Sequence, residues 1–207
     1  MNIQVDSLDG AFDQIKVISD NVTKDGGALL QKLEGNIGAL KNDWVGSDAT
    51  LHINHLIDIY DALVLLLGAA KEDCATASEK IIAIQQIRFS NSGNKGRVDT
   101  KLSAEVPQHS TIEKLTETGR YYVDANAAND SVTLGNIIAD YSKFMTAYET
   151  DFRELLDRNW KAGANWQETN NHVNEYVGEY SSKYKSYIDT AKQELDKAIK
   201  NIQQIAD

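Results

Sequence analysis

The chain has 207 residues, of which 42% are apolar, and it contains a single proline. Average usage would give about ten prolines, so the main helix breaker is nearly missing and we expect long helices. It has 21 basic and 31 acidic residues and a net charge of −10, which disfavours nucleic acid and anionic lipid as partners. The one cysteine, Cys74, excludes an intramolecular disulfide and a cysteine-based zinc site.

Neither a membrane span nor a signal peptide is predicted. The longest apolar run, 62–70, is much shorter than the roughly 20 residues that cross a bilayer. The N-terminal residues lack the basic region followed by an apolar region that marks a cleaved signal peptide.

The first 89 residues predict a helical hairpin. Apolar residues alternate at spacings of four and three residues in two stretches, which predicts helices over 7–43 and 47–88. At about 1.5 Å per residue the second helix would be on the order of 60 Å long, so we expect an elongated molecule. Between them lies Trp44-Val45-Gly46, where glycine can adopt a positive φ and Ser47 can cap the next helix.

Residues 90–130 are predicted to be a linker. They are rich in Ser, Asn, Thr and Gly, include Pro107, and show no sustained helical period. Within this region the sequence Arg-Tyr-Tyr-Val at 120–123 is expected to form a short strand or turn, or to pack on the helices.

The helical period returns over 131–207 and predicts a second hairpin, with one extra residue inserted in its last helix. The turn of this hairpin contains Trp160 and Gly163. Two amphipathic hairpins joined by a linker can bury their apolar faces against each other. We therefore predict an all-α, elongated, antiparallel four-helix bundle made of two tandem hairpins, 1–89 and 131–207, with a less regular central linker.

Candidate sites for catalysis or metal binding are weak. His52, His55 and Asp58 follow helical spacing, but the Glu-x-x-His pairs of metal-binding bundles are missing. The motifs of zinc peptidases, serine hydrolases, phosphate-binding loops and dinucleotide-binding folds are also missing. We predict no enzymatic activity, no catalytic residue, no metal and no cofactor.

Binding to another protein is the more plausible activity. Ile57 and Val64 flank the apolar seam of the second helix, and Tyr180 belongs to a series of tyrosines at helical spacing in the last helix. Tyrosine-rich surfaces bind proteins well because each ring contributes a large contact area at low entropic cost. We predict these three residues as partner-binding positions.

A Trp-x-Gly turn between two long amphipathic helices resembles the WXG family, the early-secreted-antigen-like proteins of type VII secretion systems. Trp44 and Gly46 match the motif, and Trp160 with Gly163 resemble a degenerate second copy with one residue more between them. The resemblance implies a helical hairpin that pairs with a second hairpin, no enzymatic activity, and export without a cleaved signal peptide. Each tryptophan can also simply fill the end of the bundle, and the two roles are compatible.

One departure from the family concerns the export signal. Members that carry this signal have Tyr-x-x-x-Asp/Glu after the second helix, and no tyrosine in this chain is followed by an acidic residue at that spacing. The resemblance then implies a secreted substrate that relies on a partner's signal, or a helical partner or chaperone of a larger effector. The secretion ATPase would be a further partner.

An alternative hypothesis is a cytoplasmic coiled-coil adaptor or structural protein that is never exported. The sequence also leaves two oligomeric states open, a monomer with an internal pseudo-dimer and a homodimer.

Overall fold

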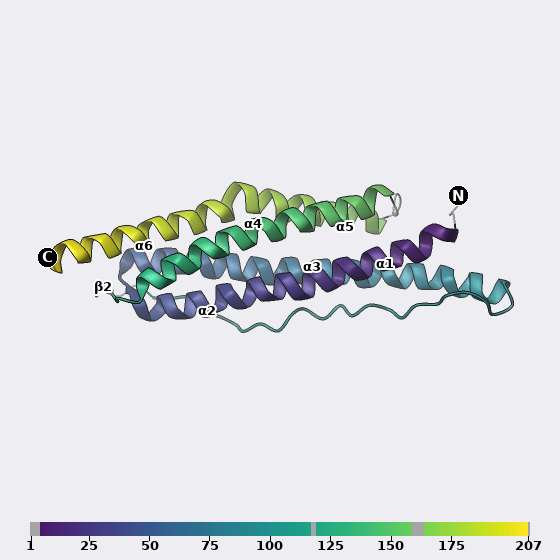
Figure 1. Cartoon of the computed structure of the whole chain (residues 1–207), viewed down its shortest axis with the longest axis horizontal. Helices are drawn as coiled ribbons and strands as arrows, with labels where there is room; N and C mark the ends of the chain where they lie inside the picture. Colours follow the sequence, from purple (N-terminus) through teal and green to yellow (C-terminus); the bar gives the residue numbers. More distant parts are fainter. Residues whose placement is uncertain (1–4, 117–118, 159–163, 207) are drawn as a thin grey trace. The chain divides into compact units, whose positions relative to one another are not determined.

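A computed structural model describes residues 5–116, 119–158 and 164–206. Of the described residues 81% are helical and almost none are in strands, so the fold is an all-α helical bundle, as predicted. The elements in chain order are α1 (Val5–Asn21), the π-helix η1 (Val22–Gly26), α2 (Gly27–Asp43), β1 (Trp44–Val45), α3 (Ser47–Asn91), β2 (Tyr122–Val123), α4 (Ala127–Arg158), α5 (Ala164–Glu179), the π-helix η2 (Tyr180–Tyr184) and α6 (Lys185–Ala206) (Figure 1).

The chain divides into two compact units. Unit 1 comprises Met1–Gly26, Leu65–Pro107 and Thr146–Tyr176. Unit 2 comprises Gly27–Val64, Gln108–Met145 and Val177–Asp207. The boundaries fall inside α3 and α4, so each unit takes residues from both of the hairpins that the sequence predicts.

Unit 1 contains α1, η1, the C-terminal parts of α3 and α4, and α5. Hydrogen bonds between its helices join Gln85 to Asp9, Lys71 to Thr23, Asn21 to Asp151, Arg153 to Asn174 and Asp73 to His172. Residue numbers rise along α3 as they fall along α1 and η1, so these helices are antiparallel. Buried apolar side chains from every one of these helices fill the interior, among them Phe12, Ile15, Leu67, Phe152 and Val173.

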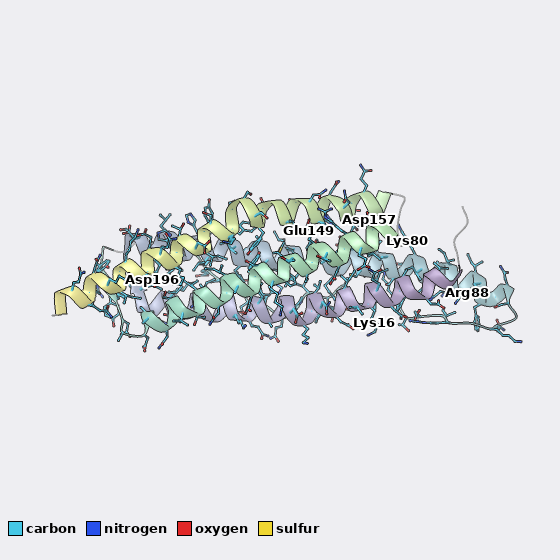
Figure 2. All side chains as sticks on the ribbon, turned by 45° about the horizontal axis from the view of Figure 1, so that its top comes forward. Lys16, Lys80, Arg88, Glu149, Asp157 and Asp196 are labelled. Carbon is cyan, nitrogen blue, oxygen red and sulfur yellow. The ribbon has the colours of Figure 1, made fainter. Side chains whose placement is uncertain are left out.

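Unit 2 contains α2, the N-terminal parts of α3 and α4, η2 and α6. Contacts between its helices join Tyr60 to Glu34, Lys32 to Asp140, Asn36 to Asp130, His55 to Tyr187, Ser142 to Tyr180 and Ser131 to Asp196, which Figure 2 labels on α6. Residue numbers run in opposite directions along α2 and α4, and along α4 and the η2–α6 segment. Its buried apolar residues include Leu33, Ile53, Leu134, Tyr141 and Ile188.

The two π-helices change the register of the long helices. A π-helical turn accommodates about one residue more than an α-helical turn, and such turns are frequent at functional sites. In the last helix the sequence spacing inserts its extra residue between 191 and 195, whereas the structure accommodates an extra residue earlier, at η2. Beyond it Ile188 is fully buried, whereas Tyr187, which the sequence spacing puts on the seam, is half-buried.

Residues 97–116, which we call the strap, are extended and follow α3 in the reverse direction. In unit 1 the amide N–H of Asp99 donates to Gln85 Oε1 at 3.0 Å, and that of Leu102 donates to Ser78 Oγ at 3.1 Å. In unit 2 the strap bonds Tyr60 and Asn54. The strap sequence has no helical period, and its structure is an extended chain. Its backbone forms hydrogen bonds with side chains of α3.

Helix α3 is also long and apolar enough to cross a membrane by length and composition alone. The core helix of a soluble protein meets the same criterion, and half of the apolar stretch is buried inside the structure. The prediction that the chain does not span a membrane stays a prediction.

Candidate functional site at the tryptophan turn

The turn between α2 and α3 is fixed by a short strand pair in unit 2. Trp44 lies opposite Val123, and Val45 lies opposite Tyr122, in antiparallel register. The amide N–H of Asp124 donates to the Asp43 carbonyl oxygen at 2.8 Å and extends this pairing. The hairpin turn is thus tied to the chain segment that precedes α4.

Gly46 has the backbone conformation that the sequence assigns to it. Its φ is +141°, a region that residues with a side chain rarely adopt. A Cβ atom at this position would also lie 3.3 Å from Tyr121 Cδ2 and 3.4 Å from the Arg120 carbonyl oxygen. Glycine is therefore favoured here for two independent reasons, conformation and space.

Trp44 is 1% exposed and begins a row of aromatic rings. Its ring stacks on His52, with centroids 5.8 Å apart and planes 7° from parallel. His52 contacts the edge of His55 at 6.3 Å, and His55 stacks on Tyr187 of α6 at 4.6 Å. We call Trp44, His52, His55 and Tyr187 the aromatic row. It connects the hairpin turn to the last helix.

Burial favours the neutral form of His52. It lowers the pKa of His52, the nearby Glu194 carboxylate opposes that effect, and His55 adds to it. A His52 that is neutral at physiological pH can stack on Trp44 without bringing a charge into the interior. The stacked rings make the row a packing element between the turn and α6.

A pair of carboxyl groups lies next to the turn. Asp43 ends α2 and Asp130 lies in the first turn of α4. Burial, together with the Asp43 charge and a hydrogen bond to Asp43, raises the pKa of Asp130 to about 6. The Asn36 side-chain amide donates to the Asp130 carbonyl oxygen at 3.3 Å. The raised pKa lets Asp130 hold a proton at mildly acidic pH.

The predicted partner-binding residues do not form an exposed surface. Ile57 is 0% exposed, and Tyr180 is 7% exposed and stacks on Tyr141 with centroids 4.7 Å apart. The Tyr180 and Ser142 hydroxyl groups are also hydrogen-bonded. Val64 is half-buried. In the folded chain Ile57 and Tyr180 belong to the interior of unit 2. The sequence predicts that their helix faces are open to a partner, but other helices of this unit cover them.

The second predicted turn lies outside the described residues. Trp160 and Gly163 fall in 159–163, so their part in the resemblance stays a prediction.

Unit 1 has a different interior, with several buried polar groups. Lys71 is 6% exposed and donates to Ser19 Oγ at 2.7 Å and to Thr23 Oγ1 at 3.0 Å. Asp73 is 9% exposed and lies 3.0 Å from His172 Nδ1. Burial raises the pKa of Asp73, and the hydrogen bond to His172 opposes that shift.

Cys74, beside this pair, is 1% exposed, and burial raises the pKa of its thiol to about 12. A thiol with that pKa is a poor nucleophile. Within the described ranges no three His, Cys, Asp or Glu side chains come together in a way that could hold a metal ion.

The acidic residues near the C-terminal end of α4 belong to no metal-binding group within the described ranges. Glu149 and Asp157 are labelled on α4 in Figure 2, and Glu149 accepts from Arg153 Nε on the same helix at 2.9 Å. An ion pair at this spacing supports an exposed helix face.

Sequence reasoning identified the turn and a short strand within 120–123, but not that the two pair with each other. The strand pairing of Trp44 with Val123 and the stacking of the two histidines depend on contacts between distant segments. The one available signal was the position of His52 and His55 on the same helix face, just after the tryptophan turn.

No family model, no curated protein and no solved structure matches this chain. The functional proposal therefore depends on the chain's own residues.

Proposed function

We propose that this chain is a non-enzymatic binding protein of a type VII secretion pathway. It acts as a secreted substrate, or as a helical partner or chaperone of a larger effector. The observation that carries the proposal is the Trp44-Val45-Gly46 turn, which joins two long helices with the tryptophan buried and Gly46 at a φ of +141°. The resemblance to the WXG family rests on the same tryptophan and glycine at this place between two long helices.

A surface beside this turn supports binding to a protein partner. Leu51 is 52% exposed, Tyr121 is 60% exposed and Tyr122 is 49% exposed, and all three lie close to the turn in sequence or strand pairing. Tyrosine and leucine side chains at a turn provide apolar area that a helical partner can cover. This surface replaces Ile57 and Tyr180 as the proposed contact region.

The second candidate function is a cytoplasmic coiled-coil adaptor. It is favoured by the absence of any Tyr-x-x-x-Asp/Glu in the sequence, because a protein without this signal needs a partner to leave the cell by this pathway. In that case Trp44 and Gly46 serve only to close the bundle end.

Localisation distinguishes the two functions. The protein is measured in culture medium and in cell lysate, in cells with the secretion ATPase and in cells without it. A lysis marker is followed in the same samples. We expect the protein in the medium only when the ATPase is present. Protein found solely in lysate, in cells whose secretion system is active and whose candidate partners are present, would contradict the proposal and favour the adaptor.

A further inference from the structure

The strap is bound in unit 2 in the way that a protein binds an extended peptide. The Asn54 side chain accepts from the Leu115 N–H at 2.8 Å and donates to the Leu115 carbonyl oxygen at 3.0 Å. The Tyr60 hydroxyl accepts from the Ser110 N–H at 3.1 Å and donates to the Ser110 carbonyl oxygen at 3.0 Å. Two side chains of α3 thus each satisfy both backbone groups of one strap residue, which orders an extended chain whatever its side chains are.

Other contacts add a preference for particular side chains. Lys114 Nζ forms an ion pair with Asp58 Oδ1 at 2.6 Å, and Asp61 lies one turn further along α3. Ile112 and Leu115 are half-buried, while the remaining residues of 108–116 are exposed. The part of the strap whose side chains contact the helices, residues 112–115, therefore has the pattern aliphatic, spacer, basic, aliphatic.

This part of the strap is held by few buried groups. None of residues 108–116 is fully buried, so apolar burial contributes little to its attachment. The Lys114–Asp58 pair is about half exposed on both sides, and exposed ion pairs contribute little. By contrast, in unit 1 two fully buried side chains of α3 hold the strap. Gln85 bonds the amide and the carboxylate of Asp99, and Ser78 accepts from the amide of Leu102.

The polar groups beneath the strap can still form hydrogen bonds when the strap leaves. The Tyr60 hydroxyl lies 3.3 Å from Glu34 Oε2, a second acceptor on α2. Asn54 is half-buried and water can reach it. Segments with few buried contacts and exposed hydrogen bonds open locally without unfolding the core.

We infer that the face of α2 and α3 beneath residues 108–116 is a binding site for an extended peptide of a partner protein. The peptide carries the aliphatic, spacer, basic, aliphatic pattern, and the strap occupies the site until such a peptide displaces it. The acidic residues Asp58 and Asp61 match the basic residue of the peptide, since both interact with Lys114. This inference does not depend on export, since an adaptor would use the same site.

The probe is a fluorescein-labelled peptide with the sequence of residues 108–116, QHSTIEKLT, measured by fluorescence anisotropy. The intact strap competes at an effective concentration in the millimolar range. The full chain is therefore also prepared with Lys114→Glu and Leu115→Asn, which weaken the strap. Lys95→Glu, in the turn after α3 and outside unit 2, is the charge-matched control.

We expect the strap-weakened chain to bind the peptide at least tenfold more tightly than the wild type or Lys95→Glu. A scrambled peptide should bind at least tenfold more weakly than the native one. Adding Asn54→Ala or Tyr60→Phe to the strap-weakened chain should reduce affinity at least tenfold, and Tyr60→Phe keeps the buried ring in place.

Two results would overturn the inference. One is the absence of peptide binding by a strap-weakened chain whose circular dichroism matches the wild type. The other is equal binding of the native and scrambled peptides. Either result leaves the secretion experiment unaffected, so the two proposals fail independently.

Discussion

The two units fill their interiors with different kinds of side chain. Unit 1 buries Lys71 and Asp73 and gives each of them polar partners on another helix. Unit 2 places an aromatic row behind its turn, starting from Trp44. Buried polar pairs add little net stability but cost a great deal when one member is lost, whereas aromatic rings contribute through area and volume. The stability of the two units should therefore respond differently when a buried side chain is truncated, when the pH changes, and when a buried polar group loses its hydrogen-bond partner.

The largest expected effect is at the start of the aromatic row. Trp44→Ala removes a ring that is 1% exposed and leaves a cavity, so we expect a loss of about 3 kcal/mol in the free energy of unfolding. Urea denaturation followed by circular dichroism measures this loss. Tyr121→Ala, at an exposed position beside the same turn, is the control and should cost less than about 1 kcal/mol.

The next effect concerns the backbone of the turn. Gly46→Ala places a Cβ at a φ of +141°, 3.3 Å from Tyr121 Cδ2, and should cost about 2 kcal/mol in unfolding free energy. Gly10→Ala is the matched control, because Gly10 lies in α1 and its added Cβ would meet nothing within 4 Å. Equal stability of the Gly46→Ala variant and the wild type would show that the turn adopts another conformation.

In unit 1 the polar pair should be sensitive to the loss of one partner. His172→Ala leaves the Asp73 carboxyl buried without its imidazole, and we expect destabilisation of about 1.5 kcal/mol at neutral pH. It should also raise the pKa of Asp73 further, since the hydrogen bond from His172 opposes the effect of burial. Carboxyl chemical shifts measured by NMR over a pH titration report that pKa directly.

Adding Asp73→Asn to His172→Ala should restore part of the lost stability, because it removes the charge from the buried site. A double variant that is as unstable as the sum of the two single variants would contradict the pairing.

The smallest effect is a pH dependence in unit 2. Folding raises the pKa of Asp130 from 3.8 to about 6. Between pH 3.8 and about pH 6, Asp130 is therefore protonated in the folded chain and ionised in the unfolded chain. The resulting stability is complete below pH 3.8 and is lost as the pH rises through about 6. From pH 5 to pH 7 the free energy of unfolding of the wild type should fall by about 1 kcal/mol relative to that of Asp130→Asn. Denaturation at each pH measures this difference. A constant difference between the two proteins would contradict the carboxyl pair.

The long helices and their turn could be predicted from the sequence because they depend on local spacing. The period from Ala49 to Ile84 predicts a helix over 47–88, and α3 spans Ser47–Asn91. Gly46 has the positive φ that its place between two helices predicts.

The burial of Ile57 and Tyr180 could not be predicted, because it depends on which helix faces cover each other. The strap could not be predicted either, since its polar sequence has no period and its hydrogen bonds go to distant side chains such as Asn54 and Tyr60. The His52–Trp44 stack likewise needs the turn to be in place before the two rings meet.

The proposed secretory function is tested most directly by comparing export of two chains that each lose a buried aromatic ring. Phe12 in unit 1 is 3% exposed and Trp44 in unit 2 is 1% exposed, so alanine at either position truncates a buried ring. The measurement is the fraction of each variant in the culture medium of cells with an active secretion ATPase, corrected for the amount of folded protein in the lysate. We predict that Trp44→Ala abolishes export while Phe12→Ala is exported in proportion to its folded amount. Equal corrected export of the two variants, or no export of the wild type, would contradict the proposal that the tryptophan turn is recognised.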